Sequence, residues 1–144
     1  RERGLDPGAV ADLLNARSGL LGVSGLSDDV RVLQASSDPR ANEALALFAY
    51  RVVREAGSLM AVLGGLDALV FTAGIGENAP SVRAAICASL SWAGIAFDES
   101  RNAAGTECIS RAESQVGVYV VPADEEAPIA RAVNRLVPDA SGSV

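Results

Sequence analysis

The sequence predicts an α/β protein with parallel strands. Two continuous apolar runs, residues 67–72 and 116–121, have the length and composition of strands buried on both faces of a sheet. A helical pattern follows each run, and a long amphipathic helical pattern precedes the first. Because helices alternate with strands in this order, we expect parallel strands joined by crossover helices. Ligands of such sheets bind beyond the carboxyl ends of the strands.

The helical segments are marked by their ends. Asp38-Pro39 places a capping residue before proline at the first helical position, and an apolar stripe then runs to Leu63, where Gly64-Gly65 ends the helix. A second helix is expected over 79–93, and a third from 124–126 to Leu136.

The other segments are shorter or less regular. We expect a short helix over 6–14, an irregular glycine-punctuated loop over 18–25, a short helix beginning at 27–31 with Ser27 or Asp28 as its N-cap, a polar connection over 98–114, and a flexible tail over 138–144.

The composition limits the available chemistry. All 12 basic residues are arginine, and both lysine and histidine are absent from the 144 residues. This excludes a Ser-His-Asp triad, a Cys-His pair, a Schiff-base lysine and a Walker-type phosphate lysine within this chain. Any catalysis here must use carboxylates, arginine, backbone N–H groups or a bound metal.

Charge and hydropathy exclude two kinds of partner. The net charge is −6, only 4% of residues are aromatic, and the arginines do not cluster, so we expect no nucleic-acid binding. No apolar run approaches the ~18 residues of a membrane span.

Cys87 and Cys108 are expected to be reduced thiols in a cytoplasmic protein. The chain begins at Arg1 without an initiator methionine, so we expect a fragment or a processed piece.

The segment after the first strand, Gly74-Ile75-Gly76-Glu77-Asn78, has the pattern of a phosphate-binding loop. Its two glycines let backbone N–H groups approach a ligand, and a helix N-terminus behind them favours negative charge. The dinucleotide pattern G-x-G-x-x-G is incomplete, because position 79 holds alanine. A tight strand-to-helix turn with Asn78 as N-cap is the alternative.

The segment after the second strand carries Asp124, Glu125 and Glu126. A carboxylate beside a phosphate loop can hold Mg²⁺ directly or through water, and one is enough because Mg²⁺ keeps several waters. The alternative is that these carboxylates only complement the dipole of the following helix.

A third candidate is Asp29-Val30-Arg31, within Ser24-Gly25-Leu26-Ser27-Asp28-Asp29-Val30-Arg31. An aspartate can accept hydrogen bonds from ribose hydroxyls, and a guanidinium can stack on a purine or pair with phosphate. A capped helix start with a solvent-exposed arginine is the alternative, and spacing alone favours it.

Together these segments resemble the C-terminal part of the acetate kinase family. The resemblance runs over nearly the whole chain and is most specific at 64–78, Gly-Gly-Leu-Asp-Ala-Leu-Val-Phe-Thr-Ala-Gly-Ile-Gly-Glu-Asn. Further matching segments are 12–15, 18–22, 24–31, 121–126 and 129–131. The chain departs from the family pattern in two places: Val30 stands where an aromatic residue is frequent, and Ala123-Asp124 stands where Thr-Asn is frequent.

The resemblance implies part of an actin/hexokinase-like (ribonuclease H-like) ATPase domain, in which ATP lies between two α/β domains. Residues 1–144 would form the C-terminal portion of the second, nucleotide-binding domain. Asp29, Val30 and Arg31 would line the adenosine pocket, and the glycine segment, with Gly74, Ile75, Gly76 and Asn78, would face the adenosine and phosphates. Glu125 would hold Mg²⁺, or Mn²⁺.

The implied reaction is reversible phosphoryl transfer from ATP to acetate, giving ADP and acetyl phosphate. This chain would supply the nucleotide and metal half of the site and no catalytic residue, so alone it should be inactive. Its implied partners are ATP or ADP, acetate or acetyl phosphate, the missing N-terminal part of the enzyme, and a second copy in a homodimer. A propionate or butyrate kinase portion, a non-catalytic nucleotide-binding module and an assembly piece remain as alternatives.

Overall fold

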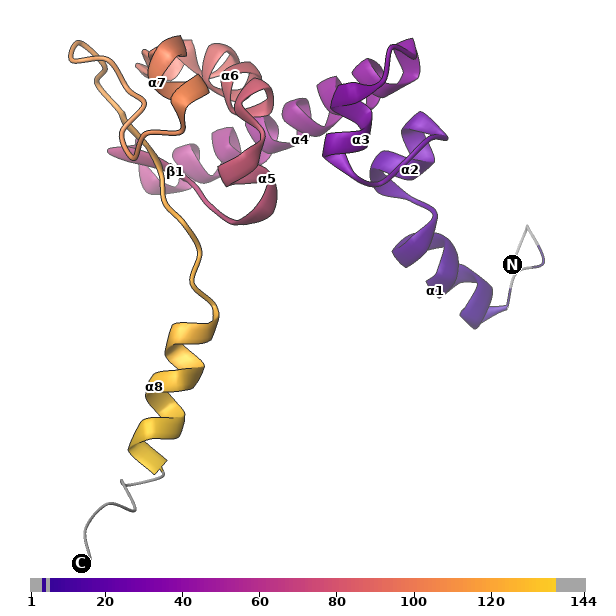
Figure 1. Ribbon diagram of the computed structural model, residues 1–144. Coiled ribbons are helices and arrows are strands. Elements are labelled where there is room, and N and C mark those ends of the chain that lie inside the picture. Colours follow the sequence, from indigo (N-terminus) through magenta and orange to yellow (C-terminus); the bar gives the residue numbers. More distant parts are fainter. Residues whose placement is uncertain (1–3, 5, 137–144) are drawn as a thin grey trace, which may run out of the picture.

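The computed structural model describes residue 4 and residues 6–136, and Figure 1 shows how their helices and strands are arranged. In chain order the elements are α1 (Pro7–Ala16), α2 (Gly19–Ser24), α3 (Val30–Ala35), α4 (Pro39–Leu63), β1 (Ala68–Phe71), α5 (Ala73–Asn78), α6 (Pro80–Ser89), the 3-10 turn η1 (Ser91–Ala93), α7 (Glu99–Ala104), β2 (Gly117–Val120) and α8 (Glu126–Leu136). The tail expected over 138–144 lies outside the described residues.

The two strands pair in parallel, as the sequence predicts. The register runs from Ala68 opposite Gly117 to Phe71 opposite Val120. On the other edge of β2, residues 107–109 pair in antiparallel fashion, since the Ile109 amide donates to the Val118 carbonyl at 2.9 Å and the Val120 amide donates to the Glu107 carbonyl at 2.8 Å. Both strands therefore end at the same edge of the sheet, where the segments that follow them can meet.

The expectation that both faces of the strands are buried is wrong for the described residues. Phe71, Val118 and Val120 face the core, whereas Val70 on the opposite face is 53% exposed. Successive strand residues point to opposite faces, and the packed helices cover one face of this sheet. Continuous apolar composition could not distinguish a strand covered on two faces from one covered on a single face.

Helices α4 and α6 form the core against the covered face of the sheet. The Asp38 carboxylate caps α4 by accepting from the Arg40 amide at 2.9 Å, and Gly64 ends it in a left-handed conformation with φ +77°. Helix α6 contributes the buried side chains Val82, Ile86 and Cys87. It ends at Ser89, so the helix predicted over 79–93 is completed by the turn η1.

Two predicted irregular segments contain helices. Residues 19–24 form α2, because Leu20 packs against the core and α2 lies along α4, which outweighs the low helix propensity of glycine. Residues 99–104 form α7, where the Asp98 carboxylate accepts from the amides of Ser100 and Arg101 and the left-handed Gly105 ends the helix.

Helix α8 projects from the packed body on the extended segment after β2 (Figure 1). It buries none of its residues, and the apolar side chains Ile129, Val133 and Leu136 are all at least half exposed. Among the described residues, no helix combines the length and apolar character needed to cross a bilayer.

Candidate nucleotide site

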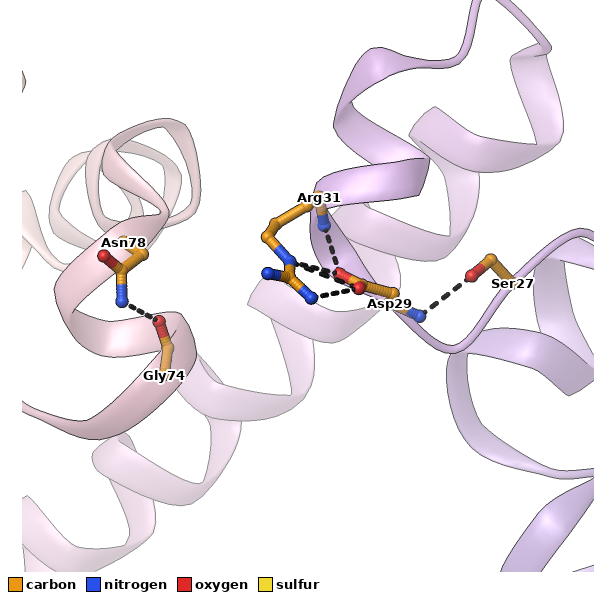
Figure 2. Close-up of polar contacts among 5 residues, drawn as sticks. All are labelled: Ser27, Asp29, Arg31, Gly74 and Asn78. Carbon is orange, nitrogen blue, oxygen red and sulfur yellow. Dashed lines mark hydrogen bonds and ion pairs between the residues drawn. The ribbon is translucent and has the colours of Figure 1, made fainter.

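The glycine segment after β1 is a helix rather than the predicted loop. Residues 73–78 form α5 immediately after Thr72, and the turn into it places Ala73 at φ +59°. The Asn78 side chain donates to the carbonyl of Gly74 at 2.9 Å (Figure 2). Asn78 is therefore part of α5, and the alternative in which it caps the next helix is wrong, because α6 begins after Ala79.

The two glycines of α5 have different surroundings. A Cβ atom on Gly76 would lie 3.1 Å from the carbonyl carbon of Phe71, whereas one on Gly74 would meet no atom within 4 Å. The second glycine therefore allows α5 to pack closely on the end of β1, and the first leaves open space beside the helix.

The start of α3 is capped by Asp29, not by Ser27 or Asp28 as predicted. The Asp29 carboxylate accepts from the Arg31 amide at 2.8 Å. Ser27 acts one step earlier, where its hydroxyl accepts from the Asp29 amide at 3.0 Å. These bonds fix the orientation of the first turn of α3 (Figure 2).

Asp29 and Arg31 also form an ion pair through their side chains. Arg31 Nη2 lies 2.6 Å from Asp29 Oδ2, and Arg31 Nε lies 3.1 Å from Asp29 Oδ1. This side-chain hydrogen bond, together with the capping bond, lowers the pKa of Asp29 from 3.8 to about 2. Because the folded-state pKa is lowered, the cap stabilises the fold above about pH 4 and this stabilisation is lost as the pH falls toward 2.

A cavity of about 560 Å³ separates the start of α3 from α5. It is lined by Asp28, Asp29, Val30, Arg31, Gly74, Ile75, Asn78 and Ala79. Two segments more than 40 residues apart in sequence thus form opposite walls, and Figure 2 shows the Arg31 side chain on the wall formed by α3 and Asn78 on the wall formed by α5. The cavity includes all the residues predicted to contact nucleotide except Gly76, which packs on β1.

A second hollow, of about 420 Å³, lies where the segments after the two strands meet. It is lined by Ala73, Gly74, Glu77, Ala123, Asp124, Glu125 and Glu126, and we call it the acidic hollow. Gly74 lines both the cavity and the acidic hollow. The structure therefore places the glycine segment and Glu125 at two neighbouring hollows that share Gly74, although the two are about 50 residues apart in sequence.

The carboxylates of the acidic hollow differ in their bonding. The Asp124 carboxylate accepts from the Ala127 amide at 2.9 Å, so it serves the start of α8, which was the alternative interpretation of this segment. Glu77 accepts from the Ala123 amide at 2.8 Å and ties the two strand-end segments together. Among the described residues no hydrogen bond engages the exposed Glu125 carboxylate.

This donor set suits a magnesium ion better than a metal held only by protein. No three histidine, cysteine or acidic side chains of the described residues converge on one point. Mg²⁺ takes one or two carboxylates and fills its other positions with water and substrate phosphates. An exposed Glu125 carboxylate without a protein partner in the described part of the chain fits that kind of coordination.

Two residues of this region were not identified from the sequence. Glu77 lies inside the glycine segment, and its role depends on a bond to Ala123, which sequence spacing does not show. Arg83 is 1% exposed and donates to the carbonyls of Gly76 and Glu77. Its position beside Val82 and one turn before Ile86, on the apolar side of α6, was the signal that it is buried.

Solved structures of known kinases match this chain over most of its length. The acetate kinase of Porphyromonas gingivalis superposes with a TM-score of 0.85 and 38% identity over 94% of this chain and 35% of that one. A propionate kinase from Francisella tularensis gives 0.82 and 35% identity over 90% of this chain and 34% of the other. The fold is therefore part of an actin/hexokinase-like ATPase.

The sequence gives a narrower assignment. An acetate kinase of Rhodopseudomonas palustris (strain TIE-1) is 51% identical over 137 residues, which make up 94% of this chain and 34% of that relative. The profile of the Acetokinase family matches residues 1–131. The chain belongs to the acetokinase family and spans about a third of the length of the curated relatives it matches.

Proposed function

We propose that this chain supplies the nucleotide and metal half of a kinase that transfers a phosphoryl group reversibly between ATP and acetate. The observation that supports this is the place of Gly74, which lines both the cavity between α3 and α5 and the acidic hollow. One ADP molecule in contact with both would have its adenosine in the cavity and its phosphates toward Glu125. The kinase names of the matching relatives support the reaction class.

In this proposal each wall of the cavity has its own task. Asp29 offers carboxylate oxygens to ribose hydroxyls, and Arg31 presents a guanidinium already oriented by Asp29. Gly74 keeps side-chain atoms away from the phosphates, while Ile75 and Asn78 complete the opposite wall. Val30 is 5% exposed, so it supports this wall largely from within the core.

Glu125 is the residue we propose as a magnesium ligand. Bound Mg²⁺, or Mn²⁺ in its place, neutralises charge on the nucleotide phosphates in phosphoryl transfer. The open carboxylate of Glu125 holds the ion, while Glu77 holds the backbone of the segment that carries Glu125 through its bond to Ala123. A nucleotide-binding module that holds no metal would bind ADP equally well with and without Mg²⁺.

The acceptor specificity of the complete enzyme depends on residues that this chain does not contribute. The similarity to a propionate kinase supports propionate as a second acceptor beside acetate.

We also propose a homodimer and a cytoplasmic location. The exposed apolar side chains Leu59, Val62 and Leu63 of α4 offer a surface for association, and the thiols of Cys87 and Cys108 are unpaired, as in a reducing compartment.

A turnover measurement tests the proposed reaction. The 144-residue chain should form no acetyl phosphate from ATP and acetate, because it holds none of the groups expected to bind the acceptor. The same chain joined to the part of the Rhodopseudomonas palustris relative that it does not cover, hereafter the joined enzyme, should form acetyl phosphate with Mg²⁺ present. Turnover by the 144-residue chain alone, or a folded joined enzyme that binds no nucleotide, would contradict the proposal.

A further inference from the structure

Arg83 is a buried cation that has no carboxylate partner among the residues that the structure describes. Its side chain is 1% exposed, and no ion pair of the described residues includes it. Removing a guanidinium from water costs free energy unless its N–H groups are all well bonded. A buried guanidinium without a carboxylate beside it therefore needs hydrogen-bond acceptors from the other groups packed around it.

Four oxygen acceptors surround the guanidinium. Nη1 donates to the carbonyls of Gly76 at 2.9 Å and Glu77 at 2.7 Å. Nε donates to the side-chain oxygen of Asn102 at 2.8 Å, and Nη2 donates to the Asn102 carbonyl at 2.7 Å. The Asn102 amide donates in turn to the Pro80 carbonyl at 2.8 Å. Burial lowers the pKa of Arg83, but an arginine remains charged at neutral pH.

These bonds join three helices at one side chain. Gly76 and Glu77 belong to the last turn of α5, whose carbonyls have no partner within the helix. Arg83 lies on α6 and Asn102 on α7. A positive charge at the C-terminal end of a helix also interacts favourably with its dipole. The guanidinium thus fixes the end of α5 against two helices of the core.

Helix α5 contributes residues to both the cavity and the acidic hollow. Gly74 and Asn78 line the cavity, and Gly74 and Glu77 line the acidic hollow. The Glu77 backbone is held by Arg83, and the Glu77 side chain holds the Ala123 amide, two residues before Glu125. A movement of α5 would therefore displace the walls of both hollows together.

We propose that Arg83, braced by Asn102, is the positioning residue that holds α5 in its nucleotide-binding position without itself touching the nucleotide. This inference rests on the proposed function, because it assumes that the cavity and the acidic hollow hold Mg²⁺·ADP. It assigns the buried charge a role in ligand affinity beyond its contribution to folding.

The first test is Arg83→Lys in the 144-residue chain. Lysine keeps the charge, but its single nitrogen cannot bond α5 and Asn102 together as the planar fork does. We expect the affinity for Mg²⁺·ADP, measured by calorimetry well below the melting temperature, to fall about 10-fold. Without ligand, amide hydrogen exchange should accelerate in peptides covering 73–79 and stay unchanged in those covering 39–63.

A double-mutant cycle separates positioning from general destabilisation. If Arg83 acts through α5, Arg83→Lys with Asn78→Ala should weaken binding hardly more than the larger single change. Arg83→Lys combined with Arg31→Ala, on the opposite wall of the cavity, should lower the affinity for Mg²⁺·ADP by the product of the two single-variant factors. If Arg83 had a purely structural role, the losses of affinity would multiply in both double variants.

Two further variants complete the experiment. Asn102→Ala keeps both bonds from Arg83 to α5 and should give a smaller loss of affinity for Mg²⁺·ADP than Arg83→Lys. If Arg83→Lys does not fold, the affinity of Asn102→Ala serves as the test. Arg101→Lys is the matched control, because Arg101, which precedes Asn102, is exposed and its side chain makes only a 3.4 Å bond to the Ser110 carbonyl among the described residues.

Three outcomes would count against this role. Unchanged ADP affinity and unchanged exchange over 73–79 in both Arg83→Lys and Asn102→Ala would overturn it, even with nucleotide binding intact in the parent chain. Loss of binding in the Arg101→Lys control would also contradict it. A parent chain that binds no Mg²⁺·ADP would overturn the proposed function, and this inference with it.

Discussion

Replacing Gly74 by leucine should lower the affinity of the 144-residue chain for ADP by at least about 100-fold, or ~2.7 kcal/mol. Gly74 lies at the junction of the cavity and the acidic hollow, and a Cβ atom there would meet nothing within 4 Å. The leucine side chain would occupy space that the proposal assigns to the nucleotide. Its backbone is helical with no positive φ, so the melting temperature should not fall. Calorimetric titration and a thermal melt measure the two quantities.

Gly57→Leu is the matched control for this experiment. Gly57 also lies within a helix, α4, and a Cβ atom at that position would meet nothing within 4 Å. It lines neither the cavity nor the acidic hollow, so its substitution should leave ADP affinity unchanged. Normal ADP binding by folded Gly74→Leu would show that the nucleotide does not pass this point.

Replacing Glu125 by alanine should remove the effect of Mg²⁺ on ADP binding. The parent chain should bind ADP more tightly with Mg²⁺ than without it, and the variant should bind equally in both conditions. In the joined enzyme, turnover should fall by on the order of 10²–10³-fold, the cost typical of losing one charge-stabilising group. Because Glu125 is exposed, the melting temperature should be unaffected.

Glu113→Ala is the control for loss of an exposed carboxylate. Glu113 is exposed and lies in the turn before β2, so this variant should keep the full magnesium dependence. The metal role of Glu125 would be wrong if Mg²⁺ had no effect on the parent chain. It would also be wrong if Glu125→Ala retained the same dependence as the parent.

The sequence was most informative where one physical rule dominated. Asp38-Pro39 and Gly64 defined α4 because a cap, a fixed φ and a left-handed terminus act locally. The strands and their parallel pairing followed from apolar runs separated by helical patterns. The resemblance carried by residues 64–78 indicated the family, which the family profile confirms over residues 1–131.

Other features depended on contacts that a linear pattern does not contain. Helix α2 exists because it packs along α4, although its glycines indicated a loop. Three acidic or hydroxyl residues in a row could each cap α3, and the choice of Asp29 depended on the geometry of the turn. The hydrogen bonds of Arg83 could not be predicted from the sequence, because they depend on α5 and α7 lying beside it in the fold. The nucleotide and metal roles assigned to individual residues remain predictions.

The most direct test of the central claim is to locate a metal-bound nucleotide on the chain. We would add Mn²⁺·ADP to the ¹⁵N-labelled protein and measure paramagnetic broadening of its amide signals, with Mg²⁺·ADP as the diamagnetic reference. Our account predicts strong broadening at both Gly74 and Glu125, with the signals of residues 39–63 less affected. Broadening at only one of these two sites, or at neither while ADP is bound, would contradict a single nucleotide–metal site formed by the two strand-end segments.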